Sequence, residues 1–266
     1  MTISLVERPR VSIAAPETGL TATVPSRHVD PRQLELTARI ATLLTRPIAY
    51  IDDAYCRLAP LEPAQLKAMA GHPAFRAPMN RAVAVNIGFA TVDVDGKLVS
   101  RLAFSPWSRL AAAIATAPMA QVRQVASMVA AAVLTKRIRA LILKADRERA
   151  HDTLGPDGFA MATHEAPVLH PALHELDAAS ATDPLFGNDS DATSRRNRIT
   201  GFGYHVVGRF FDASEPFLGQ LFSRRLPPTV KYAERDRSVK RLEKIHCEQF
   251  VKLIRRRQQS WPAITD

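Results

Sequence analysis

The chain has 266 residues, a hydrophobic fraction of 46% and a formal net charge of +10 at pH 7. This length and composition allow one good core and exclude a protein that is disordered throughout. Cys56 and Cys247 lie far apart without metal-ligand spacing, so we expect free thiols in a reducing compartment, the cytoplasm. Residues 1–26 lack the apolar run of a secretory signal, so we expect no export. The most apolar stretch, 119–134, is interrupted by polar residues and predicts a core helix rather than a membrane span.

The positive charge is concentrated in the last quarter of the chain. Between Arg195 and Trp261 there are 16 lysines and arginines but only six acidic residues, so the rest of the chain is about neutral. We therefore expect an electrostatic partner to meet this C-terminal part.

Helix signals follow one another along the first half of the chain. Residues 1–29 have no sustained apolar period and are expected to form a flexible leader. Asp30 and Pro31 are a typical N-cap and first helical residue, and they predict a helix that ends before Pro47. Further prolines predict a short helix over 63–70 and another over 78–89.

The middle of the chain combines one hairpin signal with the longest expected helix. Residues 91–100 alternate apolar and polar side chains around Asp-Gly, which favours a hairpin, although two isolated strands are marginal and a loop is equally compatible. Ser105 and Pro106 predict a helix that runs to Ala117. From Pro118 the apolar period continues past residue 140, which predicts one long helix that stops at the Leu-Gly-Pro of 154–156.

The segment 177–198 is small, polar and without period, which predicts a loop. The part that follows, 199–261, is too small to fold alone, so we expect it to pack back on the preceding helices. The fold class is then mainly α, a single multi-helix domain over 30–261. The apolar residues of the C-terminal part recur at helical spacing and are expected in the core: Phe202, Val206, Phe210, Phe217, Leu221, Leu242, Phe250 and Leu253.

Catalytic patterns are missing from the sequence. There is no phosphate-binding loop, nucleophile elbow or Cys-His dyad, and the Gly-x-Gly at 201–203 lacks the third glycine of a dinucleotide fingerprint. Asp52 and Asp53 could hold a metal, but a pair at a helix start explains them more simply. The histidines of 164–174 do not form HExxH, because Pro167 breaks the helix between them, and ordinary exposed histidines are favoured. We expect no enzyme, no cofactor and no metal site.

Three stretches, in this order, resemble the SctK family of type III secretion sorting-platform proteins, which includes YscK, PscK and NolU. RPIAYIDDAY resembles the family's opening proline–aromatic segment, and KRIRALILKADRERAHDTLGPDGFAMATHEAPVL resembles its helix with a Leu-Gly turn. ITGFGYHVVGRFFDASEPFLGQLFSRRLPP, with its trailing basic helix, resembles the Arg-Leu-Pro finish. The resemblance covers roughly 43–261, and the leader, VDVDGKLV and the 177–198 loop depart from it.

The resemblance implies a non-catalytic adaptor that links the membrane-ring protein SctD to the SctQ pods, with SctL-like stalk proteins as a further partner. It places the chain at the cytoplasmic face of the inner membrane, held there through protein contacts only, in machinery of nodulation or virulence. The charge pattern supplies candidate partner-binding residues: Arg224, Arg225, Lys240, Arg241, Lys244, Arg255, Arg256 and Arg257.

The same basic helix allows an alternative interpretation, a nucleic-acid-binding protein that uses these cations on phosphates. Two observations weigh against it. No recognised docking motif surrounds the helix, and its apolar residues have packing spacing, which predicts one face committed to the core: Val239, Leu242, Ile245, Phe250, Leu253 and Ile254. The adaptor is therefore the favoured interpretation.

Overall fold

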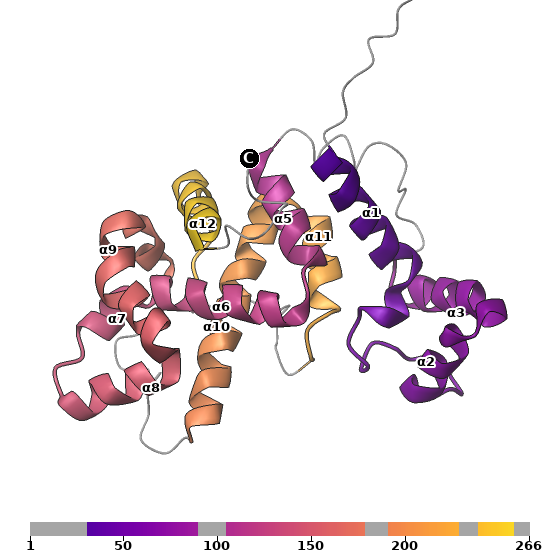
Figure 1. Ribbon diagram of the computed structural model, residues 1–266, viewed down its shortest axis with the longest axis horizontal. Helices are drawn as coiled ribbons and strands as arrows, with labels where there is room; N and C mark the ends of the chain where they lie inside the picture. The colour runs from indigo at the N-terminus through magenta and orange to yellow at the C-terminus, as the bar shows by residue number, and fades with distance from the viewer. Residues whose placement is uncertain (1–30, 90–104, 179–190, 229–238, 258–266) are drawn as a thin grey trace, which may run out of the picture.

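The structure of the chain is a computed structural model. It describes residues 31–89, 105–178, 191–228 and 239–257. Within these ranges the chain is almost entirely helical, which confirms the expected mainly α, multi-helix domain (Figure 1). The expected leader and the hairpin signal lie outside the described residues.

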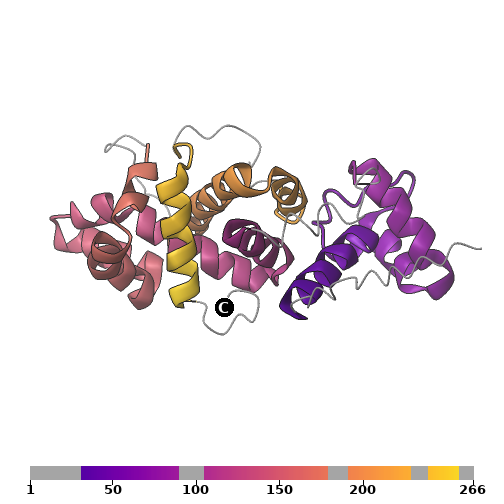
Figure 2. The same ribbon diagram turned by 90° about the horizontal axis from the view of Figure 1, so that it is seen from above.

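The α-helices of the described residues are α1 (Pro31–Thr45), α2 (Pro63–Gly71), α3 (Pro73–Asn86), α5 (Pro106–Thr116), α6 (Met119–Val133), α7 (Thr135–Arg139), α8 (Lys144–Ala160), α9 (Ala166–Leu169), α10 (Ala192–Ser214), α11 (Pro216–Ser223) and α12 (Lys244–Arg257). Three short helical turns join some of them: η1 (Pro47–Ala49), the π-helical η2 (Met161–Glu165) and η3 (Pro171–Leu176). The molecule is elongated, with α1–α3 at one end and α7–α9 at the other (Figures 1 and 2).

Several helices begin and end where the sequence predicts. α1 ends at Thr45, just before Pro47. α5 starts at Pro106, and the Ser105 hydroxyl accepts the Trp107 N–H at 3.1 Å, as an N-cap should.

The start of α3 differs from the prediction. The helix begins at Pro73 rather than Pro78, because Pro73 occupies the first helical position and the His72 Nδ1 accepts the Ala74 N–H at 3.3 Å. Pro78 lies inside the helix, where it has no N–H to donate to the preceding turn.

The long helix expected from Pro118 is three separate helices. α6 ends at Val133, where the Thr135 hydroxyl donates to the Ala132 carbonyl at 2.7 Å and so competes with the main-chain hydrogen bonds. After α7, residues 141–143 are not helical and Ile142 is 91% exposed, so the apolar period that includes Ile142 did not indicate a buried helix face. The expected stop near Gly155 appears as a kink inside α8, with φ +72°.

The expected loop 177–198 is too long at its C-terminal end. α10 begins at Ala192, because the Asp191 carboxylate accepts the Ser194 N–H at 2.8 Å and caps the helix. Arg195, Arg196 and Arg198 therefore lie on a helix rather than in a loop.

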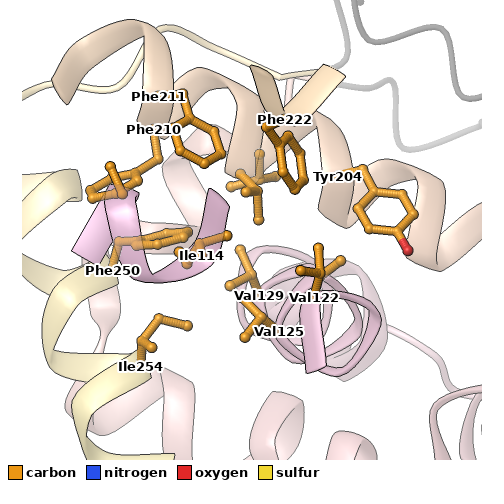
Figure 3. Packing of buried hydrophobic residues seen from close by; sticks show 14 of the residues in the cluster. Ile114, Val122, Val125, Val129, Tyr204, Phe210, Phe211, Phe222, Phe250 and Ile254 are labelled. Carbon is orange, nitrogen blue, oxygen red and sulfur yellow. The ribbon is translucent and has the colours of Figure 1, made fainter. Parts of the chain in front are cut away.

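The main core is built around α6 and α10, with α5, α11 and α12 packed on them (Figure 3). Phe250 of α12 stacks on Phe210 of α10, with ring centroids 4.3 Å apart and an interplanar angle of 12°. Phe222 of α11 packs at a tilt against Phe211, with centroids 4.9 Å apart. Of the eight core residues predicted in the C-terminal part, Phe217 is partly buried against the core and seven are buried: Phe202, Val206, Phe210, Leu221, Leu242, Phe250 and Leu253.

A second, smaller cluster is formed by η1, α2, α3 and the turn between η1 and α2. Its buried members are Ile48, Ile51, Cys56, Leu66 and Val83, and the half-buried Ile87 packs against both clusters. The helix α1 packs mainly on α5 and belongs to the main core, so it ties this end of the molecule to the rest.

Candidate partner-binding surface

The basic helix α12 lies alongside residues 165–177 and runs in the opposite direction. In the segment just before its start, the Lys240 N–H donates to the Leu176 carbonyl at 2.9 Å. In its middle, the Gln249 side chain accepts the Ala172 N–H at 2.8 Å. At its end, Arg257 pairs with Glu165. These bonds fix α12 on the outside of the helical body, where Figure 2 shows it crossing the near side.

α12 has one apolar face and one charged face. Its buried side chains are His246, Cys247, Phe250, Val251, Leu253 and Ile254. Lys244, Glu248 and Lys252 are exposed, and they follow one another at four-residue spacing along the opposite side. Ile245, which we expected in the core, is 51% exposed. Glu248 and Lys252, which follow it at three- and seven-residue spacing, are exposed, so Ile245 lies on the outer side and the expectation was wrong for this residue.

The predicted cations of α12 do not form a single patch. The helix has 14 residues and is therefore about 21 Å long, which separates Lys244 from the arginines at its end. Lys244 lies 4.0 Å from Glu248, in an exposed pair of little energetic value. At the end, Arg256 is exposed, Arg255 is half-buried and Arg257 is engaged with Glu165.

At the C-terminal end of α12, exposed cations lie near exposed aliphatic side chains of α9. Arg257 pairs with Glu165, which precedes α9. The charges of Lys252 and Arg256 lower the pKa of His170, which follows α9, so these cations lie near α9. Val168 and Leu169 of α9 are 75% and 37% exposed. We call Val168, Leu169, Lys252, Arg256 and Arg257 the α9/α12 surface. Such a combination of cations and aliphatic side chains is suited to an acidic protein surface with apolar contacts.

Arg225 is not a surface residue, in contrast to the prediction. It is 6% exposed, and its guanidinium donates to the carbonyls of Ala115 and Ala117, the latter at 2.6 Å. These carbonyls lie at the C-terminal end of α5, where helix carbonyls lack partners and a positive charge suits the helix dipole. Burial lowers the pKa of Arg225 to about 10, so the side chain stays protonated at neutral pH. Its role is structural.

Arg224 faces the small cluster at the N-terminal end of the molecule. Its guanidinium lies over the Tyr55 ring, 4.8 Å from the centroid, and its carbonyl accepts the Asp52 N–H at 2.9 Å. Arg224 thus contributes to the joint between the two hydrophobic clusters and lies away from the α9/α12 surface.

His170 is a buried residue that sequence reasoning placed among exposed histidines. It is 4% exposed, and neither ring nitrogen has a hydrogen-bond partner within the described part of the chain. Burial lowers its pKa, and the nearby Arg256 and Lys252 lower it further, while Glu165 acts in the opposite direction. The uncharged form is therefore favoured at neutral pH. The proline after His170 gave no sign of this burial.

The two aspartates that the sequence offered as candidates for chemistry have structural partners. The Asp52 carboxylate accepts the Ala54 N–H at 3.0 Å, and Asp53 pairs with Lys67. Within the four described ranges, no three histidine, cysteine or acidic side chains are arranged to hold a metal ion. In the same ranges, no helix has the length and apolar character that crossing a membrane requires.

The chain was compared with protein-family models, with curated proteins and with solved structures. Nothing matches it. The α9/α12 surface is therefore interpreted from its own geometry and charge.

Proposed function

We propose that the chain is a non-catalytic adaptor that binds an acidic protein partner through the α9/α12 surface. The observation that carries the proposal is the division of α12 into two faces. Its apolar side is committed to the core through Phe250, Leu253 and Ile254, while Lys252 and Arg256 remain exposed on the outside. Cations held on a helix that cannot move away from the body form a fixed, preorganised surface.

The sequence resemblance to the SctK family supports a specific version of this role. In that version the chain is a cytoplasmic component of a type III secretion sorting platform, at the inner face of the inner membrane. It links an SctD-like ring protein to SctQ-like pods, with an SctL-like protein as a further neighbour. Charge concentrated on one surface also speeds the association of such partners at low salt.

The proposal is tested by cross-linking and affinity purification of the tagged chain from its native host. Recovery of SctD, SctQ or SctL homologues is the expected result. Salt-sensitive recovery of DNA or RNA without these proteins would instead support the nucleic-acid alternative and overturn the adaptor.

Charge reversal then locates the surface. The variant Lys252→Glu/Arg256→Glu changes two exposed residues whose side chains make no hydrogen bond or ion pair within the described residues, so it should fold normally. It should bind its partner at least tenfold more weakly. Arg81→Glu, at an exposed position of α3, is the matched control and should bind normally. Equal losses in both variants would show that general charge, and not this surface, governs binding.

A further inference from the structure

The connection between α7 and α8 carries two large aliphatic side chains that nothing in the described structure covers. Ile142 is 91% exposed and Leu143 is 65% exposed. Ile142 has the highest exposure among the large hydrophobic residues of the described ranges. The connection lies at the extreme end of the elongated molecule, at the left in both views (Figures 1 and 2). These side chains therefore project from a tip rather than line a groove.

Cations surround this tip. Arg139, Lys144 and Arg147 are exposed on the ends of α7 and α8 that meet there. Two acidic residues are also present: Asp146 pairs with Arg149, and Glu148 lies 3.7 Å from Lys144. Residues 139–149 contain four basic and two acidic residues, so the tip has a positive excess although this part of the sequence lies outside the basic C-terminal quarter.

We propose that this tip, defined by Arg139, Ile142, Leu143, Lys144 and Arg147, binds the surface of an anionic lipid bilayer. Ile142 and Leu143 would enter the boundary between headgroups and acyl chains, where aliphatic side chains leave water without losing hydrogen bonds. The surrounding lysine and arginines would lie at the depth of the negatively charged headgroups.

A bilayer suits this geometry better than a protein does. A protein partner would need a pocket to receive a projecting tip, whereas a bilayer accepts any convex apolar tip that carries a positive collar. Two aliphatic side chains alone would bind a bilayer weakly, and the attraction of the cations to the headgroups is screened by salt. We therefore expect stable binding to require both the aliphatic side chains and the cations.

This inference does not depend on the adaptor proposal. The family resemblance implies attachment to the membrane through protein contacts only, and the tip would add direct contact with lipid. Because the tip and the α9/α12 surface are made of different residues, one can be changed without the other.

The test measures co-sedimentation of the full chain with vesicles. With vesicles of phosphatidylcholine containing phosphatidylglycerol, the unchanged chain should bind, and binding should fall with added salt and with pure phosphatidylcholine. The variant Ile142→Ser/Leu143→Ser should bind at least tenfold more weakly. Val85→Ser, at a position 59% exposed on α3, is the matched control and should bind normally.

A second measurement reports insertion directly. An environment-sensitive fluorophore on Ile142→Cys should shift to shorter wavelength with the anionic vesicles, and Cys56 and Cys247 are buried and should not compete for the label. No binding to the anionic vesicles, or no spectral shift, would overturn the proposal. So would binding that survives the serine changes but is lost in Lys252→Glu/Arg256→Glu. Concentration-dependent dimers that the serine changes abolish, without vesicle binding, would assign the tip to self-association instead.

Discussion

Gly203 of α10 lies directly against the main chain of Ala126 in α6. A methyl group at position 203 would be 1.9 Å from the Ala126 carbonyl oxygen, and the obstacle is backbone rather than a flexible side chain. This glycine therefore allows α6 and α10, which form the centre of the main core, to pack closely against each other.

Gly203→Ala should therefore force α6 and α10 apart. We expect the free energy of unfolding to fall by about 3 kcal/mol, the upper part of the range for overpacked cores. Urea denaturation followed by circular dichroism measures the change. Gly201→Ala is the control, since a methyl group there meets nothing within 4 Å and alanine favours a helix, so it should leave the stability unchanged or raise it by about 0.5–1 kcal/mol. Similar losses in both variants would contradict this account of the helix contact.

Arg225→Leu should destabilise the fold rather than a binding surface. It removes two charge-assisted hydrogen bonds to the end of α5 and leaves the carbonyls of Ala115 and Ala117 without this donor, which should cost about 3 kcal/mol. Arg225→Lys keeps the charge but cannot bridge both carbonyls as a planar fork does, so its loss should be smaller. Arg224→Ala, measured in the same denaturation experiment, should lose only about 0.5–1 kcal/mol from its contact with Tyr55.

The stability of the protein should depend on pH through His170. Its pKa is lowered in the folded state relative to the ordinary value of 6.5, so below that pH the unfolded chain takes up a proton that the folded chain does not. The contribution of uncharged His170 to the free energy of unfolding is fully present above pH 6.5 and is lost as the pH falls toward the pKa of His170 in the folded state. Denaturation midpoints at pH 7.5 and 5.5 should differ less in His170→Gln than in the unchanged chain. His164→Gln, at an exposed position, should retain the full difference.

The two cysteines should not react with thiol reagents while the protein is folded. Both are buried, and burial raises the pKa of each, to about 11 for Cys247, so little thiolate forms at pH 8. Titration with Ellman's reagent should release no colour from the native chain and two equivalents after unfolding in urea. Rapid labelling of one equivalent in the folded chain would show that a cysteine is accessible.

Local signals predicted the helices well, because prolines, caps and apolar spacing act within a few residues. The Ser105-Pro106 start of α5 and the buried face of α12 both follow from such signals. The break after α6 did not, because Leu134 and Ile138 on either side of it are both buried and continue the apolar period.

The candidate surface was harder to predict, because neighbours in sequence can have opposite environments. Arg224 and Arg225 are adjacent cations after the same helix, and only the position of α5 makes the second one buried. Arg257 also looks like its neighbours, yet it is held by Glu165, 92 residues earlier. Partners at this separation are set by the tertiary fold, which no local pattern reports.

The position of α12 also has a consequence for the order in which the protein matures during synthesis. Phe250, Leu253 and Ile254 complete the main core, and Phe250 covers Phe210, which is translated 40 residues earlier. Until α12 has left the ribosome, Phe210 lacks its stacking partner, so this part of the main core stays incomplete in the growing chain. The exposed cations of α12 reach their fixed positions only when α12 packs on the core, so an unfinished chain would lack the surface that we propose for an acidic partner.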